Sequence, residues 1–276
     1  MRTRRIRAIQ GAASVIALLA TLTACSGSAA GAGGAKTSVL KKVLERGTIR
    51  VGDCLSFAPF GFINKAGNPD GYDVDIAKQM ASDLGVKLKM VDTSSANRIP
   101  NLLTGKVDVV ICNFTENTER AKQIAFTNPY VVAGESLLVR KSSHIGGIND
   151  LSGKTVAAVK GSTDAQLVKS LNSHAGTQDY DTSQAAILAV RQGQADAMME
   201  DSNFLTYQAK LDPSLTVTHD SLVPLEYNGF GLVQGDPTWQ GWLNQFLFEL
   251  NTSGQNKHLY QKWFGAAPRY SLQPSY

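Results

Sequence analysis

The residues that follow a short apolar run, Val107 to Ile111, carry the polar groups with the clearest chemistry. Asn113, Thr115 and Arg120 supply an amide, a hydroxyl and a guanidinium in one short segment. Hydroxyl and amide groups make single hydrogen bonds to a carboxylate, and arginine makes a two-pronged one. The apolar run is typical of a buried strand, and open α/β sheets bind ligands at the carboxyl ends of their strands. The segment therefore predicts a site for a small carboxylate, with no group placed to do chemistry.

Strands and helices alternate in two series along the chain, as the spacing of apolar residues indicates. The alternating pattern over 86–91 predicts a half-exposed edge strand, and the continuous runs predict interior strands. Each series predicts a parallel sheet that helices cover on both faces. The first comprises strands 48–53, 86–91 and 107–111 with helices 73–84 and 97–104, and the second comprises strands 155–159 and 195–199 with helices 164–171, 183–191 and 203–211.

Two extended segments, 136–141 and 227–233, flank the second series. They predict that the chain crosses twice between two lobes and that its C-terminal part completes the first lobe. The connection is then a two-strand hinge. An amphipathic helix follows, with the spacing of a helix packed on a sheet. Its apolar face, which we interpret as core, comprises Trp239, Trp242, Leu243, Phe246, Leu247 and Leu250.

The first 24 residues have the pattern of a signal peptide. Four arginines precede an apolar stretch, 8–24, that is too short and too weakly apolar for a comfortable membrane span. Its end, Leu22 to Cys25, resembles the lipobox of bacterial lipoproteins, whose cysteine becomes the N-terminus and carries the lipid. We therefore expect lipidation at Cys25, with an ordinary secretory signal as the alternative. Residues 26–35 are almost all Ser, Gly and Ala, which predicts a flexible tether.

The basic character of the chain belongs to this leader. Its removal takes away four arginines and no acidic residue, so the formal charge of +4 becomes zero. No basic cluster remains to suggest nucleic acid as a partner, and no later apolar run approaches the length of a membrane helix.

Two cysteines, Cys54 and Cys112, follow apolar runs that we expect to form neighbouring parallel strands. In an exported protein such a pair can form a disulfide, here at the floor of the cleft. Two buried free thiols are the alternative, because the sequence does not supply the distance that a bridge demands. Without a nearby histidine cluster the pair is a poor metal site.

From about residue 39 to 265 the chain resembles the bacterial extracytoplasmic solute-binding proteins of polar amino acid ABC transporters, family 3. Each matching piece is weak alone, but their order and spacing together are specific. The pieces are Phe57 to Phe60, Gly71 to Ala77, Arg98 to Pro100, Leu102 with Leu103, Gly105 to Asp108, Thr115 with Glu119 and Arg120, Phe126 to Tyr130, Gly161 to Thr163, and Tyr260 with Lys262 to Gly265. The resemblance implies a two-lobed periplasmic-binding-protein-like α/β fold, each lobe a doubly wound sheet.

In the first lobe, the resemblance implies that Arg120 grips the α-carboxylate of an amino acid. A cation near the start of the expected helix 118–125 is unfavourable unless an anion offsets it, which supports this role. Asn113 and Thr115 would add hydrogen bonds. Phe57 matches an aromatic wall over the aliphatic part of the ligand, with a core residue as the alternative. Arg98 either reaches a side-chain carboxylate or only pins its own helix to the cleft wall.

In the second lobe, Gly161, Ser162 and Thr163 lie where a strand turns into a helix, and free backbone N–H groups there attract an anion. The resemblance implies that Thr163 touches the same carboxylate, although Ser162 or Thr163 could be a simple helix cap. Asp201 matches the acidic residue that pairs with the α-ammonium of the ligand, with Glu200 as its solvated partner.

Two departures from the family pattern bear on the ligand. Cys54 stands where binders of acidic ligands can place an arginine and binders of cationic ligands an aspartate. Ser95 stands where cation binders often carry an aromatic wall. Cationic amino acids are therefore the least expected ligands, and an acidic or neutral polar side chain remains.

The expected protein is a monomeric, lipid-anchored, extracytoplasmic binding protein without metal or cofactor, whose partners are an amino acid, an ABC permease and the membrane. A dehydratase of cyclic amino acid precursors on the same fold is one alternative, although His144, His174, His219 and His258 fall outside the matched positions. A sensor module for a receptor is another. The expected segments are a signal peptide (1–24), a tether (25–37), a first lobe (38–136), a second lobe (137–226) and the completion of the first lobe (227–276).

Overall fold

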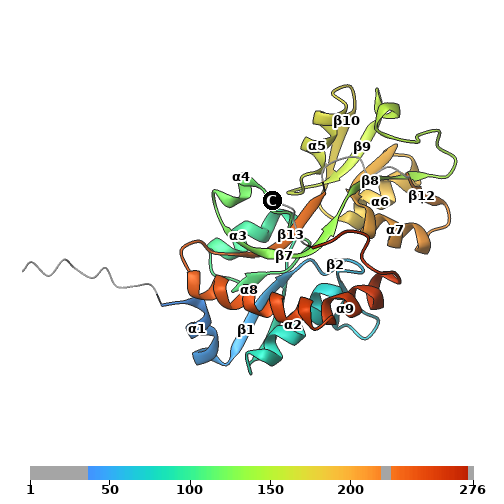
Figure 1. Ribbon diagram of the computed structural model, residues 1–276. Coiled ribbons are helices and arrows are strands. Elements are labelled where there is room, and N and C mark those ends of the chain that lie inside the picture. The colour runs from blue at the N-terminus through green and yellow to red at the C-terminus, as the bar shows by residue number, and fades with distance from the viewer. Residues whose placement is uncertain (1–36, 219–224, 273–276) are drawn as a thin grey trace, which may run out of the picture. The chain divides into compact units, whose positions relative to one another are not determined.

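The computed structural model describes residues 37–218 and 225–272 (Figure 1). The expected signal peptide, Cys25 and all of the tether before residue 37 lie outside these residues. In the described part, no helix is both long enough and apolar enough to cross a membrane.

The first sheet has the strand order β5-β1-β6-β13-β7. As expected, β1 is the parallel neighbour of β6, and β5 is an edge strand beside β1. Its strands are β1 (Thr48–Asp53), β5 (Lys87–Asp92), β6 (Val109–Val110), β7 (Ala125–Ala133) and β13 (Glu226–Leu232). The helices that precede β8 or follow β13 in the sequence are α1 (Val39–Arg46), α2 (Tyr72–Asp83), α3 (Arg98–Leu103), α4 (Thr118–Ala121), α8 (Pro237–Thr252) and α9 (Gln255–Phe264).

The second sheet has the order β10-β9-β11-β8-β12. Strand β9 lies between β10 and β11 and is parallel to both. Its strands are β8 (Glu135–Arg140), β9 (Thr155–Val159), β10 (Gly176–Tyr180), β11 (Ala197–Asp201) and β12 (Leu215–Val217), and its helices are α5 (Asp164–Leu171), α6 (Ser183–Gln192) and α7 (Ser202–Leu211). Strands β2 (Ser56–Phe57), β3 (Gly61–Ile63) and β4 (Pro69–Asp70) form a small third sheet. Short 3₁₀ turns cover Ser95–Asn97 and Ile148–Leu151.

The expectation of wholly parallel sheets is wrong. Strand β13 runs antiparallel to β6 and β7, and β8 runs antiparallel to β11 and β12. The difference arises where the chain crosses between the sheets. Strand β7 belongs to the first sheet and β8 to the second, and only Gly134 separates them. The second expected crossing segment, 227–233, is β13 itself, and the chain between β12 and β13 includes residues outside the described set. The fold is the expected two-lobed α/β architecture, with mixed sheets.

Two expected elements are shorter in the structure. The apolar run 107–111 contributes only Val109–Val110 as a strand, because its ends pair with single backbone groups of β1. The helix expected over 118–125 ends at Ala121, since the chain from Ala125 onward is needed as β7.

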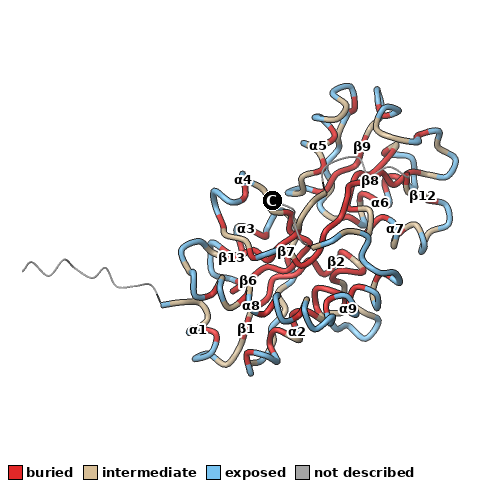
Figure 2. The backbone as a smooth tube through the Cα atoms, viewed as in Figure 1, coloured by how far each residue is buried: buried red, intermediate tan, exposed pale blue. Residues whose placement is uncertain are grey.

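Buried residues gather along the central strands of both sheets, and exposed residues lie on loops and outer helix faces (Figure 2). Helix α8 buries the expected apolar face apart from Trp242, which is half-buried. Trp239 is fully buried, and its indole N–H donates to the carbonyl of Asp108 at 3.1 Å. The aromatic stripe is therefore core, as expected.

A disulfide joins Cys54, after β1, to Cys112, after β6. The parallel pairing of the two strands brings the Cα atoms to 5.2 Å, within the span that a bridge requires. The sequence separation is 58 residues, so the bridge closes a long loop in the unfolded chain.

Reduction of this bridge is predicted to lower the free energy of unfolding by about 2 to 4 kcal/mol, because the unfolded chain regains the entropy of the open loop. Urea unfolding with and without dithiothreitol measures the change. The double variant Cys54→Ser, Cys112→Ser is the control, since it should be insensitive to the reductant. Equal stabilities of the oxidised and reduced wild type would contradict the prediction.

Candidate functional site

One cavity collects most of the residues expected at the site. Residues from both lobes line it, and they include the disulfide. The expected residues in its lining are Phe57, Arg98, Asn113, Thr115, Arg120, Ser162 and Thr163. Asp201 is absent from the lining, whereas its neighbour Glu200 is present. Of the histidines in the described residues, none lines the cavity, and His219 lies outside the described set.

Arg120 points into the cavity from the first turn of α4. The helix begins after Asn117, whose side chain accepts the backbone N–H of Arg120 at 2.8 Å. The guanidinium donates to the carbonyls of Thr115 at 2.7 Å and Gly161 at 3.0 Å. Burial lowers the pKa of Arg120, and the negative charge of Glu226 opposes that shift. The group is thus a buried cation whose hydrogen-bond partners in the protein are carbonyl oxygens.

Arg98 has a structural set of contacts. Its guanidinium donates to the backbone carbonyls of Ser95, Cys112, Asn113 and Gly161 over 2.9 to 3.2 Å. Burial, and then repulsion from Arg120, lower the pKa of Arg98 to about 9, so the group stays charged at neutral pH. These contacts favour the second of the two roles considered for Arg98, which is to fix α3 and the adjacent loops at the cavity wall.

Asn113 has a backbone conformation that few side chains adopt, with φ of 41°. Its N–H donates to the Tyr130 hydroxyl at 3.0 Å and to the Asp73 carboxylate at 3.3 Å. The Tyr130 hydroxyl in turn donates to Asp73 at 2.9 Å. This buried network lies beneath the cavity and holds the loop after β6 in its strained form.

The turn between β9 and α5 presents Ser162 and Thr163 differently. Ser162 is used locally, because its hydroxyl lies 2.7 Å from the Val159 carbonyl and 2.8 Å from the Asp164 carboxylate. Thr163 is the N-cap residue of α5 but makes no side-chain cap bond. Its hydroxyl instead donates across the cavity to Glu226 at 3.1 Å. Thr163 is therefore the member of this pair with a hydroxyl directed at the cavity.

Phe57 combines a place in the cavity wall with a place in the core. It lines the cavity and is also buried against Phe204 of α7, with ring centroids 4.1 Å apart. A stacked ring that forms one wall of the site is thus held by the second lobe.

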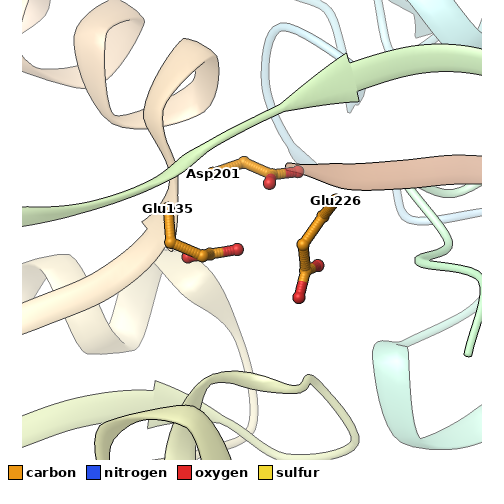
Figure 3. Close-up of side chains that lie close together, drawn as sticks. All are labelled: Glu135, Asp201 and Glu226. Carbon is orange, nitrogen blue, oxygen red and sulfur yellow. The ribbon is translucent and has the colours of Figure 1, made fainter. Parts of the chain in front are cut away.

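The acidic groups are more numerous than the sequence suggested. Asp164, Asp181, Glu200 and Glu226 line the cavity. One carboxyl oxygen from each of Glu135, Asp201 and Glu226 lies within 4.8 Å of the other two. Figure 3 shows these three side chains close together. Among the described residues, these three could meet on one cation.

Asp201 is almost wholly buried at the end of β11 and accepts a hydrogen bond from the side-chain amide of Asn113. Its other carboxyl oxygen has no partner within the described protein. The side chain lies next to the cavity but not in its lining.

Glu135 and Glu226 were not expected at the site. Both are acidic residues at the ends of extended crossing segments, which is the signal that could have identified them. Sequence reasoning treated those segments only as connections between lobes.

Burial raises the pKa of Asp73, Asp164 and Asp201 to about 7. Burial, and then repulsion from Asp201 or Asp164, raise the pKa of Glu135 and Glu200 as well. Each of these carboxyl groups is easier to protonate in the folded protein than in the unfolded chain, where an aspartate ionises near pH 3.8.

The ligand-free protein is therefore predicted to lose stability as the pH rises from about 4 to about 7, because the folded state holds protons in that range that the unfolded state has released. Each group contributes up to about 1.4 kcal/mol per pH unit. Thermal unfolding at pH 5 and pH 8 should give the higher melting temperature at pH 5.

The variants Asp73→Asn and Asp75→Asn form a matched pair for this test. Burial raises the pKa of Asp75, but hydrogen bonds from Lys262, Lys78 and Trp263 outweigh it and leave the pKa lowered. Asp73→Asn should flatten the pH dependence, and Asp75→Asn should leave it unchanged. A melting temperature that rises between pH 5 and pH 8 would show the prediction to be wrong.

A fold of two lobes with a polar cavity lined from both is the architecture of a solute-binding protein. The sequence model of the bacterial extracellular solute-binding proteins, family 3, matches residues 49–266, and the chain belongs to this family. It is 31% identical over 214 residues to the ABC transporter glutamine-binding protein GlnH of Bacillus subtilis, covering 76% of this chain and 78% of that protein.

Solved structures agree with this assignment. A mutant of ArgBP from T. maritima is 36% identical with a TM-score of 0.78, over 83% of this chain and all of the other. An ancestral amino acid-binding protein described as a precursor of cyclohexadienyl dehydratase is 37% identical with a TM-score of 0.78, over 82% and 100%. The Bacillus subtilis relative is named as a glutamine-binding protein and the ancestral one as an amino acid-binding protein. By its family and these relatives, the chain is a solute-binding protein and not an enzyme.

Proposed function

We propose that this protein is an extracytoplasmic lipoprotein, anchored through Cys25, that captures a polar L-amino acid by hinge closure and delivers it to an ABC permease. The main support is the convergence of Arg120, Thr115 and Thr163 on one cavity that also adjoins buried carboxyl groups. A cation with two hydroxyl groups suits an α-carboxylate, and a carboxylate suits an α-ammonium. The Bacillus subtilis relative is named as part of an ABC transporter, which supports delivery to a permease.

The charges of the lining refine the ligand. Asp164, Glu200 and Glu226 would repel an acidic side chain, and Arg98, the cation that could have received one, is used by backbone carbonyls. Of the two classes left open by the sequence, we favour a neutral polar side chain. The glutamine-binding relative supports this choice. Arginine is bound in structures of ArgBP from T. maritima, and the acidic lining weakens the sequence argument against such ligands.

A screen of the twenty amino acids by thermal shift tests the proposal, on protein freed of bound ligand by unfolding and refolding. A ligand that binds only the folded state raises the melting temperature. We expect the largest rise with L-glutamine or another neutral polar amino acid, and no rise with glutamate. A rise with none of the twenty would contradict amino acid capture, and a rise confined to lysine and arginine would overturn the neutral assignment.

Asp201→Asn is predicted to weaken amino acid binding by about 2 to 5 kcal/mol, the scale for removal of one partner from a buried charge pair. Glu200→Gln is the matched control, because Glu200 is the adjacent carboxyl group and lies in the lining. Calorimetric titration of both variants with the amino acid that ranks first in the screen measures the losses. A loss larger for Glu200→Gln than for Asp201→Asn would transfer the ammonium-binding role to Glu200.

A further inference from the structure

Glu226, the first residue of β13, holds a position that matters for ligand entry. Its carboxylate accepts the hydroxyl of Thr115 at 2.6 Å and the hydroxyl of Thr163 at 3.1 Å. Thr115 belongs to the loop after β6 in the first lobe, and Thr163 precedes α5 in the second. A single carboxylate thus links the two sides of the cavity.

The two hydroxyl groups are those that the proposed function assigns to the α-carboxylate of the ligand. The guanidinium of Arg120 lies close enough to Glu226 for their charges to interact. Two hydroxyl donors and a nearby guanidinium are the surroundings expected for a bound carboxylate. In this structure the carboxylate in those surroundings is that of Glu226.

The backbone of Glu226 is held by the pairing of β13 with β7, but its side chain has few partners in the described residues. Its side-chain hydrogen bonds are those from Thr115 and Thr163. The carboxyl groups of Glu135 and Asp201 lie near that of Glu226 (Figure 3), and the charge of Glu226 raises the pKa of both. If a carboxylate from solution replaces that of Glu226, the hydroxyl donors keep an acceptor. The only contacts that Glu226 loses are ones that the incoming carboxylate can make in its place.

We propose that Glu226 is an internal stand-in for the ligand carboxylate, which links the two lobes across the cavity and must be displaced when an amino acid binds. This inference rests on the proposed function. It has two consequences. The apparent affinity equals the intrinsic affinity multiplied by the fraction of molecules in which Glu226 has left the position. Ligands without a carboxylate do not compete with it, so Glu226 also contributes to specificity.

The test uses Glu226→Ala, which vacates the position, with acetate as the probe. Acetate carries the same carboxylate as the missing side chain, and it should raise the melting temperature of Glu226→Ala by several degrees more than that of the wild type at equal concentration. Glu249→Ala is the control, because Glu249 lies exposed on α8 and its loss changes the net charge equally. Chloride at the same ionic strength controls for salt.

A second measurement is calorimetric titration with L-glutamine. The internal competitor is absent in Glu226→Ala and lacks its charge in Glu226→Gln, so both variants should bind at least about tenfold more tightly than the wild type. Asp201, Glu135 and Glu200 remain to receive the ammonium group in both. The isosteric Glu226→Gln keeps the test valid if the alanine variant folds poorly.

The outcomes separate this inference from the proposed function. If amino acids bind the wild type, while acetate has no selective effect and Glu226 variants bind L-glutamine equally or more weakly, the stand-in role is wrong and the function stands. If acetate stabilises Glu226→Ala selectively and no amino acid binds any form, the carboxylate position is real and the amino acid function fails.

Discussion

The arrangement of the site depends on one backbone carbonyl, that of Gly161. Arg98 and Arg120, both from the first lobe, donate to this oxygen of the second lobe at 2.9 and 3.0 Å. Both guanidinium groups also lie over the ring of Phe114, with their carbon atoms 4.2 and 5.0 Å from its centroid. One oxygen atom and one ring thus position two cations that would otherwise repel each other.

Glycine is required at this position for two independent reasons. Its φ is +84°, a conformation that side chains rarely adopt, and a Cβ atom would lie 2.6 Å from the Cα of Ala96. The second lobe can therefore approach the loop before α3 only where the side chain is absent. The close approach in turn brings Thr163 within reach of the first-lobe residues, so the geometry of the carboxylate position follows from the Gly161 contact.

The strands and helices with strong local patterns were predictable. Strand β9 and helix α5 have the predicted bounds, and β1 begins and ends at the predicted residues. These segments have continuous apolar runs or clear helix boundaries, so local periodicity identifies them. The parallel neighbours β1 and β6 followed from the alternation of elements, which left the disulfide between Cys54 and Cys112 as one of two possibilities.

The features that sequence reasoning missed depend on long-range pairing. Strand β7 has a mixed composition, and its antiparallel pairing with β13 joins segments about a hundred residues apart, which local patterns do not report. Glu226 was overlooked for the same reason, since an acidic residue at the start of a strand gains its meaning only from Thr115 and Thr163. The cluster of carboxyl groups likewise exists only once the crossings bring Glu135 and Asp201 together.

The bonds within and between the lobes differ in kind, and this difference favours rigid-body motion. Within the first lobe, the disulfide and the buried network of Asp73 and Tyr130 fix the cavity floor. Across the lobes, the contacts described above are hydrogen bonds and the stacking of Phe57 on Phe204, each of which water or a ligand can replace.

Hinge motion absorbs its change in a few residues between such rigid bodies. Gly134, the single residue between β7 and β8, lies where that change must occur. Immediately after it, Glu135 joins the carboxyl cluster with Asp201 and Glu226. In the hinge closure that we propose, the charge of a ligand in the cavity would act directly on the residues at the hinge and so couple occupation of the site to the relative position of the lobes.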